Sequence, residues 1–324
     1  MGLKWIKILT HIHTLNSDGK DTLEAMAEAA KKHNIDAICL TDHNTMAGYE
    51  NFDKVYEVNG VKIIKGIEYT TFYGHIIAID APYYRWENIN KKSLNELVDY
   101  VHKNDGIIGI AHPRQLGDPV STGATFEFEN VDFKNIDFIE TWHRVINESN
   151  EWERNEKFWL DKINAVGKIT CLYGGDFHAK ENFDKSSAVN WLLIDENKEF
   201  LEAVKEGIRC GRLIMSKGVC FDMTLENNNE IYNIGDTALL SEKEQYRVTI
   251  KPCELVKDIS MKVCIVSNDG ILAEAKYDEK CNIQFKLYGD KRVKWIRAKI
   301  IDYRSNDTIA ITNPIYFKTR KEVD

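Results

Sequence analysis

The sequence predicts an α/β barrel followed by a small all-β, sandwich-like domain. Over the first two thirds of the 324 residues, short apolar runs alternate with amphipathic stretches, a succession typical of a mainly parallel sheet with helices between its strands. Seven such runs occur, which favours a barrel over an open sheet. The runs span residues 5–9, 36–41, 61–67, 106–111, 136–141, 168–173 and 212–216.

The predicted helices lie between these runs. Residues 21–33 open with Asp21 and continue with a capping-box pattern and strong helix formers. Residues 93–103 repeat that pattern. Residues 151–167 are amphipathic and end on Gly167, a residue well suited to a helix C-cap.

The pattern of apolar and polar residues changes near residue 218. From there on, short alternating strands follow one another between clusters of Asn, Asp and Gly, and no long helical pattern appears. We therefore expect two domains, residues 1–217 and residues 218–324.

Composition narrows the class of protein. Hydrophobic residues make up 43% of the chain, charged residues 29%, and the formal charge is −8, so a broad nucleic-acid-binding face is not expected. The N-terminal stretch "LKWIKIL" is too short and too rich in Lys for a signal peptide or a membrane span. The seven cysteines form no CxxC pair, which favours free thiols in a reducing compartment. We expect a cytoplasmic protein with a small-molecule substrate and no nucleic-acid or membrane partner; the oligomeric state stays open.

Metal-binding residue types gather at the ends of the apolar runs. Six of the nine histidines lie at or just beyond the C-terminal ends of these runs, and carboxylates occupy equivalent places. The histidines are His11, His13, His43, His112, His143 and His178, and the carboxylates are Asp18, Asp42, Glu68 and Asp176. Because the carboxyl ends of parallel strands meet on one face of a barrel, these side chains are expected to converge.

A single histidine at a strand end is most often a satisfied surface or core residue. His33 and His102, in helical stretches, keep that interpretation, but it does not account for six separate strand ends. In a strand, residues i and i+2 face the same way, so His11 and His13 form a pair that can hold one ion. The same spacing makes a pair of Asp176 and His178.

The types of donor atom among the candidate ligands limit which metal ions can bind. Imidazole and carboxylate without thiolate suit Zn, Mn or Fe(II), and a carboxylate such as Glu68 can bridge two ions. The candidate ligands are too many for one ion and suit two or three divalent ions. They are His11, His13, Asp18, His43, Glu68, His112, His143, Asp176 and His178. Such a centre activates water and polarises the oxygens of a displacement at phosphorus or at an acyl carbon.

The order of these motifs resembles that of a known family. "HIHTLNSDG", "TDHN", "GIE", "AHP", "TWH" and "GGDFHA", between residue 8 and about residue 180, are similar to the successive motifs of the polymerase and histidinol phosphatase (PHP) metallohydrolases. The family fold is a distorted (β/α)7 barrel, in agreement with the seven runs. Many members carry His where Asp18 stands, and others carry Asp.

The resemblance implies three metal sites. One ion would be held by His11, His13, Glu68 and Asp176. A second would share Glu68 and add His112 and His143. A third would use Asp18, His43 and His178.

A shorter resemblance covers mainly residues 200–318. "FLEAVKEGIRCGRLIMSKG", the "IGDT" turn and "RAKIIDYRSNDTIAITNPIYF" are similar to the CehA/McbA subgroup, which includes a carbamate-ester hydrolase. Phosphoester cleavage is the leading prediction, and carboxylic or carbamic ester hydrolysis on the same metal centre is the alternative. A non-catalytic binding module would need broken ligand motifs, and none is broken.

Four residues are candidates for roles other than, or in addition to, metal binding. Arg114 follows "AHP" and can present its planar guanidinium to a phosphate, although a plain surface role fits it equally well. His75, in "YGHIIAI", can face either the site or the core, and the site mouth, where it would be a second substrate contact, is the favoured expectation. His178, or Asp18 if the third ion is absent, is the candidate for delivering the leaving-group proton. No GxSxG nucleophile elbow is present.

Overall fold

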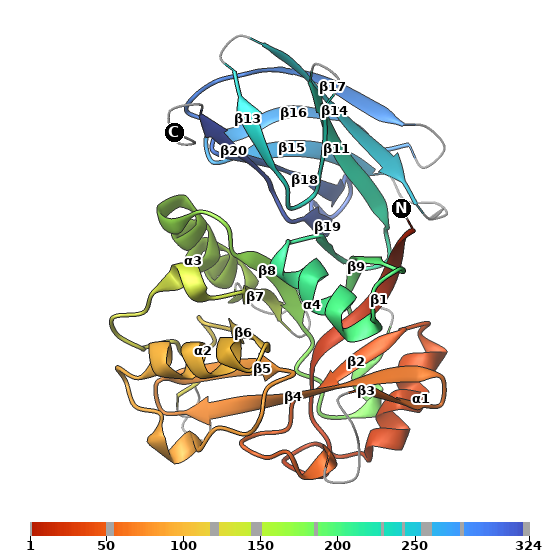
Figure 1. Ribbon diagram of the computed structural model, residues 1–324. Coiled ribbons are helices and arrows are strands. Elements are labelled where there is room, and N and C mark those ends of the chain that lie inside the picture. The colour runs from red at the N-terminus through yellow and green to blue at the C-terminus, as the bar shows by residue number, and fades with distance from the viewer. Residues whose placement is uncertain are drawn as a thin grey trace. The chain divides into compact units, whose positions relative to one another are not determined.

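The chain forms two compact units, Met1–Arg209 and Cys210–Asp324 (Figure 1). The computed structural model describes residues 2–49, 55–116, 123–143, 151–184, 187–227, 230–241, 244–253, 261–278 and 282–319. No helix in these ranges is long and apolar enough to cross a membrane.

The first unit is built on one sheet with the strand order β9-β1-β2-β4-β5-β6-β7-β8, and β3 pairs with β4. The strands are β1 (Leu3–Ile12), β2 (Ala37–Leu40), β3 (Val55–Val58), β4 (Val61–Thr71), β5 (Gly74–Ile79), β6 (Ile107–Ile110), β7 (Phe138–His143), β8 (Thr170–Gly174) and β9 (Val189–Asp195). The sheet curls until β1 meets β8. Ile12, at the end of β1, forms a parallel bridge with Phe177, just beyond β8. The backbone N–H of His13 donates to the Phe177 carbonyl at 2.8 Å. The strands from β1 to β8 thus form the predicted distorted barrel.

The barrel reaches its seven strands by a different route from the one the sequence predicts. The run at residues 212–216 forms a strand of the second unit instead. Its place in the ring is taken by β5, which pairs antiparallel with both β4 and β6. Only Phe72 and Tyr73 separate β4 from β5, and a connection this short can join only antiparallel neighbours.

Helices follow several of the strands. They are α1 (Leu23–Lys32), α2 (Leu94–Lys103), α3 (Glu151–Val166) and α4 (Phe200–Arg209). Helix α1 begins one residue later than its capping pattern suggests, because the Thr22 side chain, not that of Asp21, accepts the backbone N–H of Ala25. Gly167 ends α3 as predicted, with a φ of 95° and its N–H donating to the Ile163 carbonyl at 3.0 Å.

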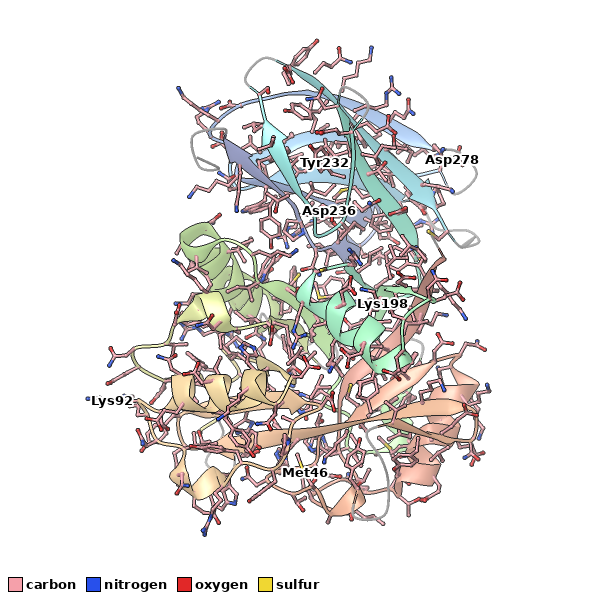
Figure 2. All side chains as sticks on the ribbon, in the orientation of Figure 1. Met46, Lys92, Lys198, Tyr232, Asp236 and Asp278 are labelled. Atoms are coloured by element: carbon pink, nitrogen blue, oxygen red, sulfur yellow. The ribbon has the colours of Figure 1, made fainter. Side chains whose placement is uncertain are left out.

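The barrel core consists largely of β-branched side chains. Isoleucines from six different strands are completely buried, and Figure 2 shows how densely side chains fill the space between strands and helices. They are Ile8, Ile38, Ile63, Ile76, Ile108 and Ile139. Burial of each such side chain contributes about 1.5–3 kcal/mol to the free energy of folding. The strands whose ends carry the candidate ligands are therefore held in place by a well-packed core.

The second unit is all β within its described residues. One sheet has the order β13-β20-β18-β19-β10, with β15 beside β18 and β16 beside β15, and the other has the order β12-β11-β14-β17. The strands are β10 (Leu213–Ser216), β11 (Phe221–Asn227), β12 (Glu230–Asn233), β13 (Thr237–Leu240), β14 (Gln245–Pro252), β15 (Met261–Ser267), β16 (Gly270–Lys276), β17 (Ile283–Tyr288), β18 (Trp295–Asp302), β19 (Thr308–Thr312) and β20 (Ile315–Thr319).

Alternating burial marks the inner face of this unit. On β14, Tyr246, Val248 and Ile250 are buried while their neighbours are more exposed. The turn in "IGDT" is fixed by Asp236, labelled in Figure 2, whose carboxylate accepts the backbone N–H of Asn233 at 2.7 Å. The boundary predicted between residues 217 and 218 falls inside this unit, just after β10.

Candidate metal centre

All nine candidate ligands come together at one face of the barrel. Their donor atoms form overlapping groups in which the atoms lie within 4.8 Å of one another. Glu68, His11 and His13 are completely buried, whereas Asp18, His43 and His178 are partly exposed. The centre therefore has a buried floor and an open side.

The innermost group contains four donor atoms from three strand ends. The Nε2 atom of His11 lies 2.9 Å from Nε2 of His13, 3.2 Å from Oε2 of Glu68 and 3.4 Å from Oδ1 of Asp176. The Nε2 atom of His13 is 3.4 Å from the same Glu68 oxygen and 3.0 Å from the same Asp176 oxygen. Donor atoms around a tetrahedral zinc ion, with bonds of about 2.0–2.1 Å, are roughly 3.4 Å apart. The spacing of the His11, His13 and Glu68 atoms fits one ion, and the Asp176 oxygen lies beside both histidines as a further donor.

Unsatisfied buried atoms support the same conclusion. Oε2 of Glu68 is buried and accepts no hydrogen bond, although ring nitrogens of His11, His13 and His43 lie 2.8–3.4 Å away. Buried polar atoms in proteins nearly always have a partner. An oxygen surrounded by misaligned imidazole nitrogens has the environment of a metal ligand, so the residues fit the ions that the sequence predicts.

Local backbone geometry places these donors. His11 and His13 project from the same side of β1, and the completely buried Ile12 between them faces the other way. Asp176 has a φ of 49°, a left-handed conformation that Asp tolerates better than most residues. This turn after "GG" directs the carboxylate of Asp176 back over the end of β1.

A second group surrounds the other oxygen of Glu68. Its Oε1 atom lies 3.0 Å from Nδ1 of His75 and 3.3 Å from Nε2 of His112. His143 stands nearby, with Nε2 3.0 Å from Oδ2 of Asp176. Burial of His112 and its neighbouring imidazoles, outweighing Glu68, lower its pKa to about 4, so His112 is a neutral donor at neutral pH.

His75 is the residue whose place the sequence interpretation missed. It is only 7% exposed and lies beside Glu68, not at an exposed mouth. The other candidate ligands lie at or just beyond the C-terminal ends of predicted strands. Because β5 runs antiparallel, its N-terminal end reaches the face of the site, and His75 is the second residue of β5. The two-residue connection between β4 and β5 was the signal that could have revealed it.

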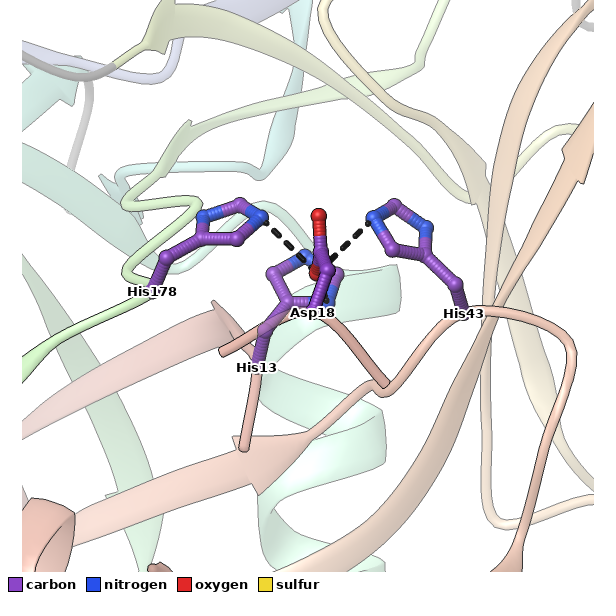
Figure 3. Close-up of side chains that lie close together, drawn as sticks. All are labelled: His13, Asp18, His43 and His178. Carbon is purple, nitrogen blue, oxygen red and sulfur yellow. Dashed lines mark ion pairs between the residues drawn. The ribbon is translucent and has the colours of Figure 1, made fainter. Parts of the chain in front are cut away.

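The third group lies on the open side. Figure 3 shows the Asp18 carboxylate between the rings of His43 and His178, next to His13. Its Oδ1 atom is 3.2 Å from Nε2 of His178 and 3.4 Å from Nε2 of His43. The Asp18 side chain is 58% exposed, so water and a substrate can reach this group from the solvent.

The charges of this group distinguish the two candidate proton donors. Burial raises the pKa of Asp18, but hydrogen bonds from His178 and His43 outweigh it and lower that pKa far below its usual value. Burial disfavours the charged form of His178, but Asp18 and Asp176 outweigh it and raise the pKa of His178. In this arrangement a proton is held more firmly by His178 than by Asp18, and the role of either as proton donor stays a prediction.

The comparisons with known proteins agree with this geometry. The family model of the PHP domain matches residues 10–209. The chain belongs to the PHP domain family.

Two curated proteins are similar to parts of the chain. A phosphoribosyl 1,2-cyclic phosphate 1,2-diphosphodiesterase of Eggerthella lenta is 34% identical over 62 residues, which are 19% of this chain and 24% of that enzyme. This chain therefore spans about a quarter of that enzyme's length. An uncharacterized protein of Methanocaldococcus jannaschii is 27% identical over 146 residues, which are 41% of this chain and 81% of that protein.

A solved structure is similar over nearly the whole chain. It is a two-domain protein from Bacteroides vulgatus that contains a predicted PHP-like metal-dependent phosphoesterase. The TM-score is 0.50 at 15% sequence identity, and the match covers 97% of this chain and 96% of that one. The likeness confirms the fold, a PHP domain followed by a β-rich region.

Within the PHP domain, Asp42 supports the site without joining a ligand group. Its carboxylate accepts hydrogen bonds from the Thr14 backbone N–H at 2.7 Å, the Thr14 hydroxyl at 2.8 Å and the Ser17 hydroxyl at 2.6 Å. Gly19 closes the same loop, because a Cβ there would lie 2.6 Å from the Thr14 nitrogen. Together these contacts hold the loop that carries Asp18.

Arg114 lies two residues beyond His112 and is exposed. Its backbone N–H donates to the Asn155 side chain at 2.7 Å, and its guanidinium carbon is 4.8 Å from the centre of the Phe158 ring. A cation–π contact uses the face of the guanidinium, so the N–H groups at its edge point away from the ring and suit an anion. A contact between Arg114 and a substrate stays a prediction.

A cavity of about 290 Å³ opens beside the third group. Asp176 and His178 form part of its wall, and the rest combines the apolar Phe177 and Ala179 with the polar or charged Lys20, Glu181, Asn182, Asp184 and Ser187. A small polar substrate can therefore approach the ligands from this side.

Proposed function

We propose that this PHP domain protein is a metal-dependent phosphoesterase that acts on a small phosphorylated substrate through two or three divalent ions, of Zn, Mn or Fe. The position of Glu68 carries the proposal. One of its oxygens faces His11 and His13 at 3.2–3.4 Å, and the other faces His75 and His112 at 3.0–3.3 Å. A buried carboxylate placed in this way is suited to bridge two ions.

The proposed ligand sets are those that the resemblance to the PHP metallohydrolases implies, and the overlapping groups of donor atoms support them. His11, His13, Glu68 and Asp176 would hold one ion. Glu68, His112 and His143 would hold a second, with His75 as a further donor. Asp18, His43 and His178 would hold the third, exposed ion.

The bound ions would supply Lewis-acid stabilisation and an activated water. The chain itself orients the donors and, on the open side, leaves room for the substrate. Where the third ion is absent, His178 is placed to give a proton to the leaving oxygen. Arg114 would add a charge-assisted contact to a substrate phosphate.

Phosphoesters are preferred over neutral esters for two reasons. The Eggerthella lenta relative is a diphosphodiesterase, and the Bacteroides vulgatus protein contains a predicted metal-dependent phosphoesterase. In addition, Lys20 lines the cavity beside the third group, and Arg114, two residues beyond His112, would supply a second positive charge to an anion. The resemblance of residues 200–318 to the CehA/McbA subgroup supports the alternative, a carboxylic or carbamic ester hydrolase.

A substrate panel tests the choice. The full chain, purified with its native metals retained, is assayed against aryl phosphomonoesters, aryl phosphodiesters, aryl acetates and aryl carbamates. We expect a higher kcat/KM for one of the phosphoester classes and loss of that activity after chelation. Faster turnover of the neutral esters would contradict the phosphoesterase and support the alternative.

A further inference from the structure

Glu140 lies under the metal centre and contacts two of its ligand residues. It belongs to β7 and is completely buried. Its Oε1 atom is 2.9 Å from Nδ1 of His11, and its Oε2 atom accepts the backbone N–H of His112 at 3.1 Å. One carboxylate thus ties the end of β1 to the turn after β6.

The contact with His11 selects a tautomer. An ionised carboxylate only accepts hydrogen bonds, so the hydrogen between the two groups belongs to Nδ1 of His11. The lone pair of Nε2 then points toward His13, Glu68 and Asp176, where the first ion would lie. Carboxylates that hold a ligating imidazole in this way are a common second layer of metal sites.

The contact with His112 holds an unfavourable backbone. His112 has a φ of 25°, a conformation that costs a residue with a side chain energy and persists only where its surroundings impose it. The hydrogen bond from its N–H to Glu140 is one such restraint. It keeps the imidazole turned toward Oε1 of Glu68.

The neighbouring strand leaves space for this carboxylate. At Gly174 of β8, a Cβ would lie 2.1 Å from the carboxyl carbon of Glu140 and 2.2 Å from its Oε2 atom. Any larger residue at position 174 would displace Glu140. The space is thus matched to the carboxylate, as expected of a position with a specific task.

We propose that Glu140 is a positioning residue for the metal centre: it sets the ring of His11 and the backbone of His112 without binding an ion itself. A donor atom of Glu140 lies within 4.8 Å of donor atoms of His11 and His112, but both of its oxygens are already within hydrogen-bond distance of protein nitrogens, which argues against a ligand role. The inference rests on the metal centre proposed above.

Glu140→Gln gives the sharpest test because it keeps the shape of the side chain. A glutamine has one accepting oxygen and one donating NH₂ group, so it cannot accept from both His11 and His112. If the NH₂ group faces His11, it forces the tautomer with hydrogen on Nε2; if it faces His112, two N–H groups oppose each other. We expect Zn²⁺ affinity, measured by competition with a chromophoric chelator, to fall about 10- to 100-fold.

Asp137→Asn is the matched control. The Asp137 carboxylate also accepts from one histidine and one backbone N–H, those of His102 and Ile108, each at 2.8 Å, but it belongs to no ligand group. Its replacement should lower the melting temperature of the metal-free protein and leave Zn²⁺ affinity unchanged. Gly174→Ala, which pushes Glu140 aside, should weaken Zn²⁺ binding in the same direction as Glu140→Gln.

The number of ions bound at saturating Zn²⁺ separates positioning from ligation. We expect Glu140→Gln to bind as many ions as the wild type. Wild-type affinity in Glu140→Gln, or the loss of one whole ion at saturation, would overturn the inference while the proposed function stands. A wild-type protein that binds no Zn²⁺ would overturn both.

Discussion

Glu68 and His11 are the residues on which the site depends most. Glu68 offers one oxygen to each of two donor groups, and His11 lies between Glu68, His13 and Asp176 on one side and Glu140 on the other. A change at either residue should therefore affect the ions before it affects the barrel.

Replacing His11 with alanine should abolish hydrolysis and lower the metal content of the protein. The change removes one donor of the innermost group, while the strands around it keep their hydrophobic core. Mass spectrometry of bound metals and circular dichroism on the same sample measure both effects. Full metal occupancy with normal turnover would contradict the ligand assignment.

The third group should be separable from the other two. Asp18→Ala is expected to remove at most one ion, because Asp18 is exposed and, within the described part of the chain, joins only the donor group of His13, His43 and His178. Asp161→Ala, at another exposed carboxylate, is the control and should lose none. Loss of two or more ions from Asp18→Ala would show that the three groups are not independent.

Arg114→Met tests the phosphoester assignment. A phosphomonoester carries nearly two negative charges at neutral pH, and a hydrogen bond to such a charged group is worth about 1.5–3 kcal/mol, or roughly ten- to a hundredfold. We expect kcat/KM for phosphoesters to fall by that factor, with metal content and the turnover of neutral esters unchanged. Arg304→Met, at an exposed arginine of the second unit, controls for the loss of charge. An unchanged response to phosphoesters would remove Arg114 from the site.

Most ligand residues could be predicted from the sequence because the rule that places them is geometric. In a parallel barrel every strand ends at the same face, so His and Asp or Glu at these ends must converge. The rule misses His75, which enters the site at the beginning of an antiparallel strand. It also misses Glu140, which lies inside the apolar run at residues 136–141 and acts through other residues.

At the level of secondary structure, local sequence patterns are sufficient to predict the helices and the parallel strands. Helices α1, α2 and α3 form where their amphipathic patterns predict them, although Thr22 and not Asp21 caps α1 and the Ser93 side chain makes no capping hydrogen bond to α2. Strand β5 was not predicted, because "GHIIAI" is brief and its partner strands are determined by tertiary pairing. The run at residues 212–216 is a strand as predicted, but it pairs with β19, a contact that no local pattern reveals.

Helix α4 is anchored by a buried charge. The amino group of Lys205 is completely buried, and it lies 2.8 Å from Oδ2 of Asp80 and 2.9 Å from Oδ2 of Asp105. Lys205→Met would remove the cation that pairs with the buried carboxylate of Asp80, which should lower the free energy of unfolding by about 3–5 kcal/mol. Urea denaturation of the metal-free protein measures this.

Lys198→Met is the control for Lys205→Met. Lys198, labelled in Figure 2, lies two residues before α4 and forms an ion pair with Glu206, which belongs to α4. Both side chains are partly exposed. Such pairs are worth about 0–1 kcal/mol. Equal costs for the two replacements would contradict a special role for burial at Lys205.

For the molecule as a whole, the two units should behave as two separately folded domains. The structure divides the chain between Arg209 and Cys210, and the change in sequence pattern comes near residue 218. Limited proteolysis should give its first cuts between residues 209 and 222 and leave fragments of the size of each unit. Cuts elsewhere, together with a single cooperative melt, would contradict this division.

The polynuclear metal centre is the central claim, and a count of bound ions tests it most directly. The full chain is purified without chelators, its divalent ions are counted by mass spectrometry, and phosphoester hydrolysis is measured on the same sample before and after chelation. We predict two or three ions per chain, parallel loss of ions and activity, and recovery when Zn²⁺ or Mn²⁺ is restored. Fewer than two ions per chain, or hydrolysis that persists after the ions are removed, would contradict the account.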